Sequence, residues 1–486
     1  MSKYWVRIDI KGTNLGKGSG IMPDKNYEIL ALTMRYWFIG LIIFVVIRIV
    51  LETMGTKKGQ NYRNEGPFGH IIFFMVVFLI SAFALLAYKG SGVYDIYTAI
   101  LGLVVGISLI LQYNLFRLIF PYSDRLLLIV VDLLAIFGFI MLYRFSAELG
   151  VNQIKHFAYG NLGMLFFIFF TKRIRVGRKL GYTIMMVGCI LLLLPIVLGK
   201  EVYGARNWVS IMGLSFQPSE FVKIILVFVF ASWFKHDGGF REHLPAFIFA
   251  AISVILVVLQ KDLGAALLYF YVFLFVYYMA SSDWIITTLA LGAAALGSVI
   301  SYRLFSHVRI RIEAWKNPWR DIENKGYQIA HSLIAISSGG LIGTGLGLGS
   351  PQVVPAFKTD FIFATLCEEF GIITGLCIIG LYAIIVLRGV TIAMRSQESY
   401  WSLLAFGATV ALSMQAFTII GGVIKMIPLT GVTMPFVSFG GSSMVSSLAL
   451  IGVLEGVAIT VPSLDEDMVD QTHETDGEGD YEEWID

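Results

Sequence analysis

The sequence predicts an all-α polytopic membrane protein, and two observations indicate this class. Hydrophobic residues make up 57% of the 486 residues and charged residues only 14%, whereas soluble chains carry about 25% charged residues. Apolar stretches close to the length of about 20 residues that crosses a bilayer recur along the chain. In lipid each stretch must satisfy its own backbone hydrogen bonds, so each is expected to be a helix. The net charge of +2 is too small to indicate nucleic acid binding.

About thirteen apolar segments follow one another along the chain. Three early segments, at 30–51, 70–89 and 94–120, predict an N-terminal extension, 1–123, with about three transmembrane or interfacial helices. The later segments predict a ten-helix core over 124–461. These later segments lie at 125–146, 154–171, 179–198, 219–234, 244–260, 264–280, 284–304, 361–387, 402–424 and 436–460.

The basic stretch "TKRIRVGRK" (Thr171–Lys179) orients the core, because short loops rich in Lys and Arg stay in the cytoplasm. Counting helices outward from it places four connections outside the cytoplasm, at 199–218, 260–263, 305–360 and 425–435. The C-terminal tail, 462–486, then lies inside. It carries eleven acidic residues and no Lys or Arg after Leu464, so it is expected to be disordered.

The stretch "VVLQKDLGAALL" places Lys261 and Asp262 between two apolar segments, on the outer side of the membrane. One interpretation is structural, because Asp is a favoured N-cap and the next helix begins near Gly264. The other is catalytic, because a partly desolvated carboxylate beside a lysine can serve as a general base. The residues alone leave both interpretations open.

Further candidate side chains gather on the same side. The motif "QPSEFVK" places Glu220 and Lys223 three residues apart on one helical face. They form either a local ion pair at a helix end or the polar lining of a path for a substrate that enters from the bilayer. Arg206, in "GARNW", is a cation close to this motif in the sequence.

Segment 305–360 is predicted to be a large extracytoplasmic loop that is rich in cations and glycine. Arg309 and Arg311, together with "SSGGLIGTGLGLGS", suit a phosphate group, because Arg forks and backbone N–H groups both bind phosphate. The alternative is a solvated surface. At membrane depth, glycine-rich backbone must pack inside protein or line a wet cavity. Candidates for substrate binding continue beyond the glycines with Thr359, Asp360, Glu368, Ser438 and Ser442.

Six motifs, taken in order, resemble those of the SEDS family, the RodA, FtsW and SpoVE proteins of bacterial shape, elongation, division and sporulation. They are "GARNW", "QPSEFVK", "QKDLG", "GGLIGTGLG", "TDFIFATLCEEFG" and "PLTGVTMPFVSFGGSS". The resemblance covers roughly 124–461 and implies a SEDS-like core fold. The essential aspartate of the family matches Asp262, which favours the general base. Lys261 stands where the family usually has proline, and Asn207 stands where it often has arginine.

The resemblance implies a multi-pass protein of the bacterial cell membrane that polymerises lipid II into glycan strands. Asp262 would deprotonate the acceptor hydroxyl, and the donor carbon would be inverted. Arg206, Arg309 and Arg311 would stabilise the undecaprenyl pyrophosphate that leaves. No cofactor is implied with certainty. Mg²⁺ or Mn²⁺ could share the pyrophosphate, although the sequence has no dedicated cluster of metal ligands.

The family also implies a partner, a class B penicillin-binding protein that crosslinks the strands as a transpeptidase. A lipid II flippase is the alternative function, since the same cations and lipid path would serve it without a base. A scaffold that only recruits a partner is a third hypothesis, but it leaves the intramembrane charges without a purpose. The extension 1–123 and the acidic tail lie outside the resemblance, and we expect both to be dispensable for the chemistry.

Overall fold

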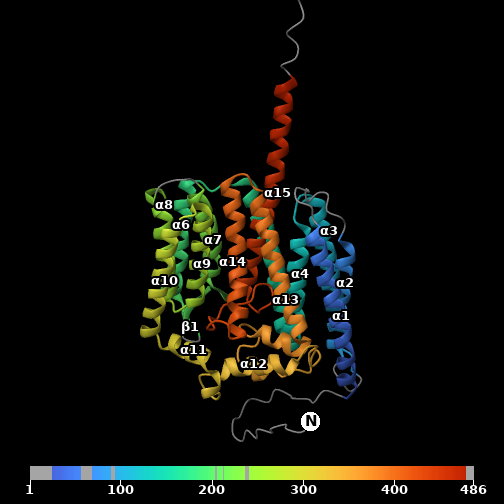
Figure 1. The fold of residues 1–486 in the computed structure, drawn as a ribbon. Coiled ribbons are helices and arrows are strands. Elements are labelled where there is room, and N and C mark those ends of the chain that lie inside the picture. The colour runs from blue at the N-terminus through green and yellow to red at the C-terminus, as the bar shows by residue number, and fades with distance from the viewer. Residues whose placement is uncertain are drawn as a thin grey trace, which may run out of the picture.

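A computed structural model describes residues 25–55, 68–88, 93–202, 205–211, 213–235 and 240–477 of the chain. The basic N-terminal residues before Lys25 and the last nine residues of the acidic tail lie outside this described part. Long helices stand side by side in one bundle (Figure 1). The predicted all-α membrane class is confirmed.

Each predicted apolar segment coincides with one long helix of the described chain. The helices are α1 (Lys25–Gly55), α2 (Gly69–Ala87), α3 (Ile96–Ile119), α4 (Arg125–Phe145), α5 (Ala147–Arg173), α6 (Arg178–Leu198), α7 (Pro218–Phe234), α8 (Phe240–Leu259), α9 (Leu263–Ser281), α10 (Trp284–Leu304), α13 (Ile362–Arg395), α14 (Ser399–Val423) and α15 (Gly441–Gly477). Eleven of them are long and apolar enough to cross a membrane by themselves. Helix α7 has 17 residues, and α5 carries more polar residues, so these two depend on their neighbours.

The centre of the bundle is formed by α4, α13, α14 and α15. The side chains of α4 are buried along almost its whole length, including those of Leu127, Leu134 and Phe137. Helices α15 and α5 pack backbone to backbone, because a side chain at Gly452 would come within 2.3 Å of the Met164 carbonyl oxygen. Small residues allow this close approach in lipid, where van der Waals packing replaces the hydrophobic effect between helices.

The connection between α10 and α13, predicted as a loop, contains four short helices. They are α11 (Ser306–Lys316), η2 (Pro318–Asp321), α12 (Tyr327–Gly339) and η3 (Pro351–Val353). The segment "SHVRIRIEAWK" is too short and too charged to show the apolar period of a membrane helix, so the sequence interpretation missed it. Helices α11 and α12 lie across one end of the bundle, and α15 projects from the opposite end (Figure 1).

A small antiparallel sheet occupies the connection between α6 and α7, where no regular structure was predicted. It consists of β1 (Lys200–Val202), β2 (Ala205–Ile211) and β3 (Leu214–Phe216), in the order β1-β2-β3. Val209 pairs with Phe216, and Ile211 pairs with Leu214 across a turn at Gly213. The backbone N–H of Arg206 donates to the carbonyl of Gln260 at 3.1 Å, which joins β2 to the turn before α9.

Helix α13 is broken at Gly371, and the glycine-rich stretch before η3 fills the break. Gly371 has φ 88 and ψ 165, far from helical values. The freed carbonyls of Glu368 and Glu369 accept from the N–H groups of Thr344 and Gly345, at 2.9 and 3.0 Å. In return, the N–H of Ile372 donates to the Gly340 carbonyl at 2.9 Å, and that of Ile373 to the Leu341 carbonyl at 3.2 Å. The glycine-rich backbone is therefore packed inside protein, one of the two environments the sequence allowed.

The N-terminal extension packs against the core as three upright helices. Phe38 of α1 and Phe78 of α2 form an aromatic cluster with Phe137 of α4 and Phe370 of α13, with ring centroids 5.5–6.1 Å apart. The first turn of α1 also reaches the glycine-rich stretch, because the Tyr27 hydroxyl donates to the Leu346 carbonyl at 3.2 Å. The start of α1 therefore lies at the end of the bundle that carries α12. This agrees with three membrane-spanning helices, because an odd number of spans places the two ends of the extension on opposite sides of the membrane.

The first part of the acidic tail continues α15. The helix runs to Gly477, and its last part stands clear of the bundle (Figure 1). The disorder expected of the acidic tail stays a prediction. Adding residues to an existing helix is much easier than nucleating one, and the membrane-embedded part of α15 supplies the nucleus.

Candidate active site

Lys261 and Asp262 form a tight turn between α8 and α9. Lys261 has φ 61, in the left-handed region. The ring of proline fixes φ near about −65°, so this turn cannot be the proline turn of the family with lysine simply replacing proline. Asp262 is the N-cap of α9, and its Oδ1 accepts from the N–H of Ala265 at 3.0 Å. The capping interpretation of Asp262 is therefore correct.

The second oxygen of Asp262 faces the polar side chains of neighbouring elements. Its Oδ2 accepts from Asn207 Nδ2 of β2 at 2.8 Å and from Gln217 Nε2, directly before α7, at 2.9 Å. The Tyr269 hydroxyl of α9 donates to the Ser219 carbonyl at 2.7 Å, which holds α9 against α7. The carboxylate is thus fixed by three elements and remains half-buried rather than sealed.

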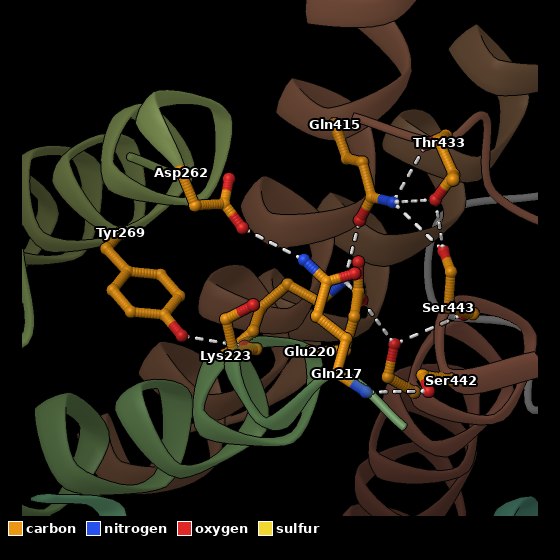
Figure 2. Close-up of polar contacts among 11 residues, drawn as sticks. Gln217, Glu220, Lys223, Asp262, Tyr269, Gln415, Thr433, Ser442 and Ser443 are labelled. Carbon is orange, nitrogen blue, oxygen red and sulfur yellow. Dashed lines mark hydrogen bonds and ion pairs between the residues drawn. The ribbon is translucent and has the colours of Figure 1, made fainter. Parts of the chain in front are cut away.

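A buried ion pair lies beside this carboxylate (Figure 2). Lys223 Nζ is 2.7 Å from Glu220 Oε2, and the exposed fractions of the two side chains are 1% and 11%. The same ammonium donates to Gln415 Oε1 of α14 at 2.6 Å. Ser446 of α15 donates to Glu220 at 2.7 Å. The pair is local, as one interpretation proposed, but it is also buried between α7, α14 and α15, where its partners compensate for its desolvation.

Ser442 and its neighbours close the network at the start of α15. The backbone N–H of Gln217 donates to Ser442 Oγ at 3.1 Å. Gln415 Nε2 donates to the Thr433 carbonyl at 2.9 Å, and Thr433 Oγ1 lies 2.6 Å from Ser443 Oγ. Figure 2 shows these groups converging from α7, α9, α14 and the segment that leads into α15. Segments that are distant in the sequence therefore build one polar region.

Arg311 of α11 approaches the same region from the outer end. Its Nη1 donates to the Thr430 carbonyl at 2.7 Å. Burial lowers the pKa of Arg311, while the charges of Asp360 and Asp262 act in the opposite direction. Burial likewise raises the pKa of Asp360, and the Thr359 hydroxyl and Arg311 oppose that shift. Arg311 and the two carboxylates are thus close enough to interact.

His307 adds a titratable group on the same helix. Burial, followed by the charges of Arg311 and Lys261, lowers its pKa. The imidazole is therefore neutral at physiological pH, and the positive charge of this region resides on Arg311 and Lys261. Asp262 is thus bonded to two amides and lies close enough to Arg311 for their charges to interact.

For the other predicted site residues, no contact with Asp262 is described. Arg309 is exposed and donates to the Arg303 carbonyl at 3.3 Å, turned away from Arg311. Arg206 is also exposed, and it is its neighbour Asn207 that contacts Asp262. Glu368 accepts from the N–H of Ser350 at 3.0 Å, so it holds the glycine-rich stretch. Ser438 is buried and donates to the Thr359 carbonyl at 2.6 Å, which fixes the segment before α15.

The sequence interpretation missed five polar side chains of the network, namely Asn207, Gln217, Gln415, Thr433 and Ser443. Asn207 and Gln217 lie inside motifs that were recognised, but neither was assigned to the site, because amides carry no charge. Gln415 lies in the middle of an apolar helix, and a buried amide within a membrane helix was a usable signal. Among the described residues no three His, Cys, Asp or Glu side chains are grouped as metal ligands.

Fold and site together define an integral membrane protein with a carboxylate, amides and cations gathered at one face of the bilayer. The sequence model of the FtsW, RodA and SpoVE family, described as cell cycle proteins, matches residues 124–461. The peptidoglycan glycosyltransferase RodA of Mycobacterium tuberculosis is 37% identical over 369 residues, which are 70% of this chain and 78% of that protein.

Two solved structures share the fold. A chain from a peptidoglycan synthase complex, described as coordinating polymerization and crosslinking, has 25% identity and a TM-score of 0.59 over 69% of this chain and 97% of its own length. The rod shape determining protein RodA of Thermus thermophilus has 24% identity and a TM-score of 0.53, over 70% of this chain and 97% of its own. The chain belongs to the FtsW, RodA and SpoVE family.

Proposed function

We propose that this protein is a peptidoglycan glycosyltransferase of the bacterial cell membrane, which polymerises lipid II into glycan strands for elongation, division or sporulation. The observation that carries the proposal is the position of Asp262. Its Oδ2 is held by Asn207 and Gln217 in a half-buried site beside Arg311. This is the arrangement that a base needs when its substrate carries both a sugar hydroxyl and a pyrophosphate.

In the proposed reaction, Asp262 takes the proton of the acceptor sugar hydroxyl. The hydroxyl oxygen forms a bond to the anomeric carbon of the donor, and the bond from that carbon to the pyrophosphate oxygen breaks. Undecaprenyl pyrophosphate leaves with the bonding electron pair, and the configuration at the carbon is inverted. Arg311 stabilises the developing negative charge, because a preorganised cation in a partly desolvated site acts without reorganisation.

The amides that hold Asp262 orient its carboxylate. The N–H of Ala265 holds Oδ1, and the two amides hold Oδ2, so the acceptor hydroxyl must displace one amide to bond to Oδ2. The buried pair Lys223–Glu220 holds α7 against α14 and α15, and this fixes the position of Gln217 directly before α7. We therefore assign positioning roles to Asn207, Gln217, Glu220 and Lys223.

We propose a class B penicillin-binding protein as the partner that crosslinks the strands. A neighbour of the same fold belongs to a synthase complex that coordinates polymerization and crosslinking, which supports such a pairing. Its contact surface on this chain is left open.

The decisive experiment supplies purified protein with lipid II in detergent and measures glycan strands. Asp262→Asn should reduce polymerisation about 10²–10⁴-fold, the usual contribution of a positioned proton-transfer group. Asn is also a good N-cap, so thermal stability should stay near that of the unchanged protein. Asp283→Asn is the matched control, because Asp283 caps α10 through the N–H groups of Ile285 and Ile286.

The same assay separates the alternative function, a lipid II flippase. Detergent removes the two sides between which a lipid could be flipped, so strands formed in detergent require the transferase. A well-folded Asp262→Asn protein that polymerises at the unchanged rate would remove Asp262 from the chemistry. Absence of strands with the unchanged protein and a partner transpeptidase would favour the flippase.

A further inference from the structure

A groove runs between α6 and α8 on the side of the bundle that faces lipid. Its cavity measures about 390 Å³ and is lined by apolar side chains, with Arg241 as the charged residue among its lining. Met186, Ile248 and Ile252 lie along it and are 58%, 49% and 40% exposed. The groove is separate from the polar region around Asp262, and the proposed reaction makes no use of it.

The length of the groove matches one leaflet of a bilayer. Arg241 and Ile252 both line it, and at 1.5 Å per helical residue they are about 17 Å apart along α8. Half of a hydrocarbon core of about 30 Å is about 15 Å. The groove therefore reaches from the membrane surface to roughly the midplane, which is the depth occupied by one acyl chain.

The mouth of the groove lies at the basic end of the bundle. Helix α6 begins with Arg178 and Lys179, and the basic stretch before it indicates the cytoplasmic face. Arg178 is ion-paired with Glu242, and Arg175 lies 2.8 Å from Glu398. Arg241 forms no ion pair with any residue that the structure describes. Its charge at the mouth is thus uncompensated within the described chain.

Lys235 adds a cation close to Arg175 and Arg178 at this end of the bundle. Lys235, at the end of α7, and Arg175 both lie over the Tyr400 ring, at 5.4 and 5.5 Å from its centroid. Burial, and then the charges of Arg175 and Arg178, lower the pKa of Lys235. Cations that crowd one another in this way gain when an anion arrives.

We infer that this groove binds one anionic phospholipid of the cytoplasmic leaflet, with an acyl chain between α6 and α8 and the phosphate on Arg241. The apolar length requires a chain, which free phosphate lacks. The cations at this end of the bundle favour a lipid with net negative charge over a zwitterionic one, because basic residues at a membrane surface attract anionic headgroups.

Such a lipid would add to the contact between the cytoplasmic ends of α6 and α8, where Arg178 pairs with Glu242. At their outer ends the two helices are joined because Gln260 Nε2 donates to the Leu192 carbonyl at 2.7 Å. Gln260 is followed by the turn that carries Asp262. A lipid in the groove therefore stabilises the helix pair that positions this turn, and the binding goes beyond the proposed transferase function.

Native mass spectrometry of the full chain, delipidated in detergent, tests the inference. We expect one phosphatidylglycerol to be retained in preference to phosphatidylcholine. Arg241→Ala should weaken phosphatidylglycerol binding about fivefold, as expected for one basic residue at an anionic surface. Arg117→Ala is the matched control, because Arg117 ends α3 outside the groove. Ile248→Trp should fill the groove and abolish retention of both lipids.

Leu289→Trp controls for the added tryptophan, since Leu289 is 67% exposed on α10. Thermal unfolding confirms that each variant is folded, and Met186→Trp on the facing helix replaces Ile248→Trp if that variant is not. Equal retention of phosphatidylcholine, or phosphatidylglycerol binding that survives groove filling, would overturn the inference. So would equal effects of Arg241→Ala and Arg117→Ala.

Discussion

The two carboxylate oxygens of Asp262 have different tasks. Oδ1 caps α9, and Oδ2 is held by two amides in a half-buried region that Arg311 approaches. The helix cap uses Oδ1, and the general-base hypothesis requires the substrate hydroxyl to displace one of the two amides from Oδ2. Capping fixes the carboxylate plane, and a base with a fixed plane presents its other lone pairs in one direction. Structure and proposed chemistry thus depend on the same side chain.

Arg311 provides the first residue-scale prediction. Arg311→Ala should raise KM for lipid II and lower kcat/KM by about 10–100-fold. The reason is that the leaving pyrophosphate loses a charged hydrogen bond, which contributes about 1.5–3 kcal/mol. Arg311→Lys should recover only part of this loss, since lysine cannot form a bidentate contact. Steady-state polymerisation rates at varied lipid II concentration measure both effects.

Arg309 on the same helix is the matched control. Its side chain is exposed and turned to the Arg303 carbonyl, so Arg309→Ala should leave kcat/KM within about twofold of the unchanged protein. If Arg309→Ala and Arg311→Ala have equal effects, helix α11 contributes only general positive charge. The proposed contact between Arg311 and the pyrophosphate would then be wrong.

At the residue scale, the sequence could identify charged side chains but not the direction in which each side chain points. Arg309 and Arg311 were equivalent candidates, and only the packing of α11 separates them. Asn207 was noted as a departure from the family, yet its bond to Asp262 follows from the pairing of β2, which no local pattern predicted. Lys261 was noted as a departure from proline, but its left-handed φ of 61 could not be predicted from the residue type.

Helix α13 illustrates the element scale. A break in a membrane helix leaves carbonyl and N–H groups without partners, and lipid cannot satisfy them. Here the glycine-rich stretch supplies the missing donors and acceptors, and the Glu369 carboxylate adds bonds to the Gly347 N–H at 2.9 Å and to Arg144 at 2.8 Å. The neighbouring carboxylates of Glu368 and Glu369 are therefore partnered by backbone N–H groups and by a cation.

Gly371→Ala should destabilise this element strongly. The residue has positive φ, and an added Cβ would lie 2.3 Å from the Leu341 carbonyl oxygen and 2.5 Å from the Gly343 nitrogen. We expect a loss of about 2 kcal/mol or more, as for other strained left-handed positions. Thermal unfolding in detergent micelles measures the change.

Gly380→Ala is the control in the same helix. An added Cβ at Gly380 meets no atom within 4 Å, so this change should be neutral or stabilise the helix by up to about 1 kcal/mol. A Gly371→Ala protein as stable as Gly380→Ala would show that the break in α13 is not required.

The sequence predicted the long helices well, because the thickness of the bilayer requires each membrane helix to have a run of about 20 apolar residues. It did not predict α11, α12 or the sheet, because these elements have 13 residues or fewer and are too short to give the length signal of a membrane helix. The network of Gln415, Thr433 and Ser443 was also missed, since the residues come together only through packing. The acidic tail was interpreted by composition, and its continuity with α15 was overlooked.

At the scale of the whole molecule, the contacts between the N-terminal extension and the core bear on whether the core is stable alone. The resemblance to known proteins begins near Asp124, so the extension was expected to be dispensable. In the structure, however, Gln112 of α3 donates to Asp132 Oδ1 of α4 at 3.1 Å, and Asp132 is only 4% exposed. The extension thus covers an intramembrane carboxyl group that lipid would disfavour.

Deletion of 1–122 should therefore lower the stability of the core. Asp132 would lose Gln112 and face lipid, at a penalty of about 2.5–3.5 kcal/mol for an acidic residue near a helix centre. Asp132→Leu in the shortened chain should restore much of the lost stability, since lipid accepts leucine freely. Thermal unfolding of the purified proteins, with membrane integration checked first, measures this.

The full-length Asp132→Leu protein completes the comparison. There the change should have a smaller effect, because α2 and α3 still cover the site. If the shortened chain is as stable as the full chain and polymerises normally, the extension is dispensable, as the sequence suggested. If leucine fails to restore stability, the contacts of Tyr27 and Phe38 with the core are the main contribution of the extension.

Helix α15 has one further consequence. Its 37 residues give a rod of about 55 Å, against a hydrocarbon core of about 30 Å. Ser442 and Ser446, near one end, bond to Gln217 and Glu220, and the other end stands free of the bundle. Pro462 lies within this helix, and because proline has no backbone N–H it removes one hydrogen bond there. The part of α15 beyond Pro462 can therefore bend relative to the part that carries Ser442 and Ser446, so a protein bound at the inner end would be mechanically separated from the outer serines by this joint.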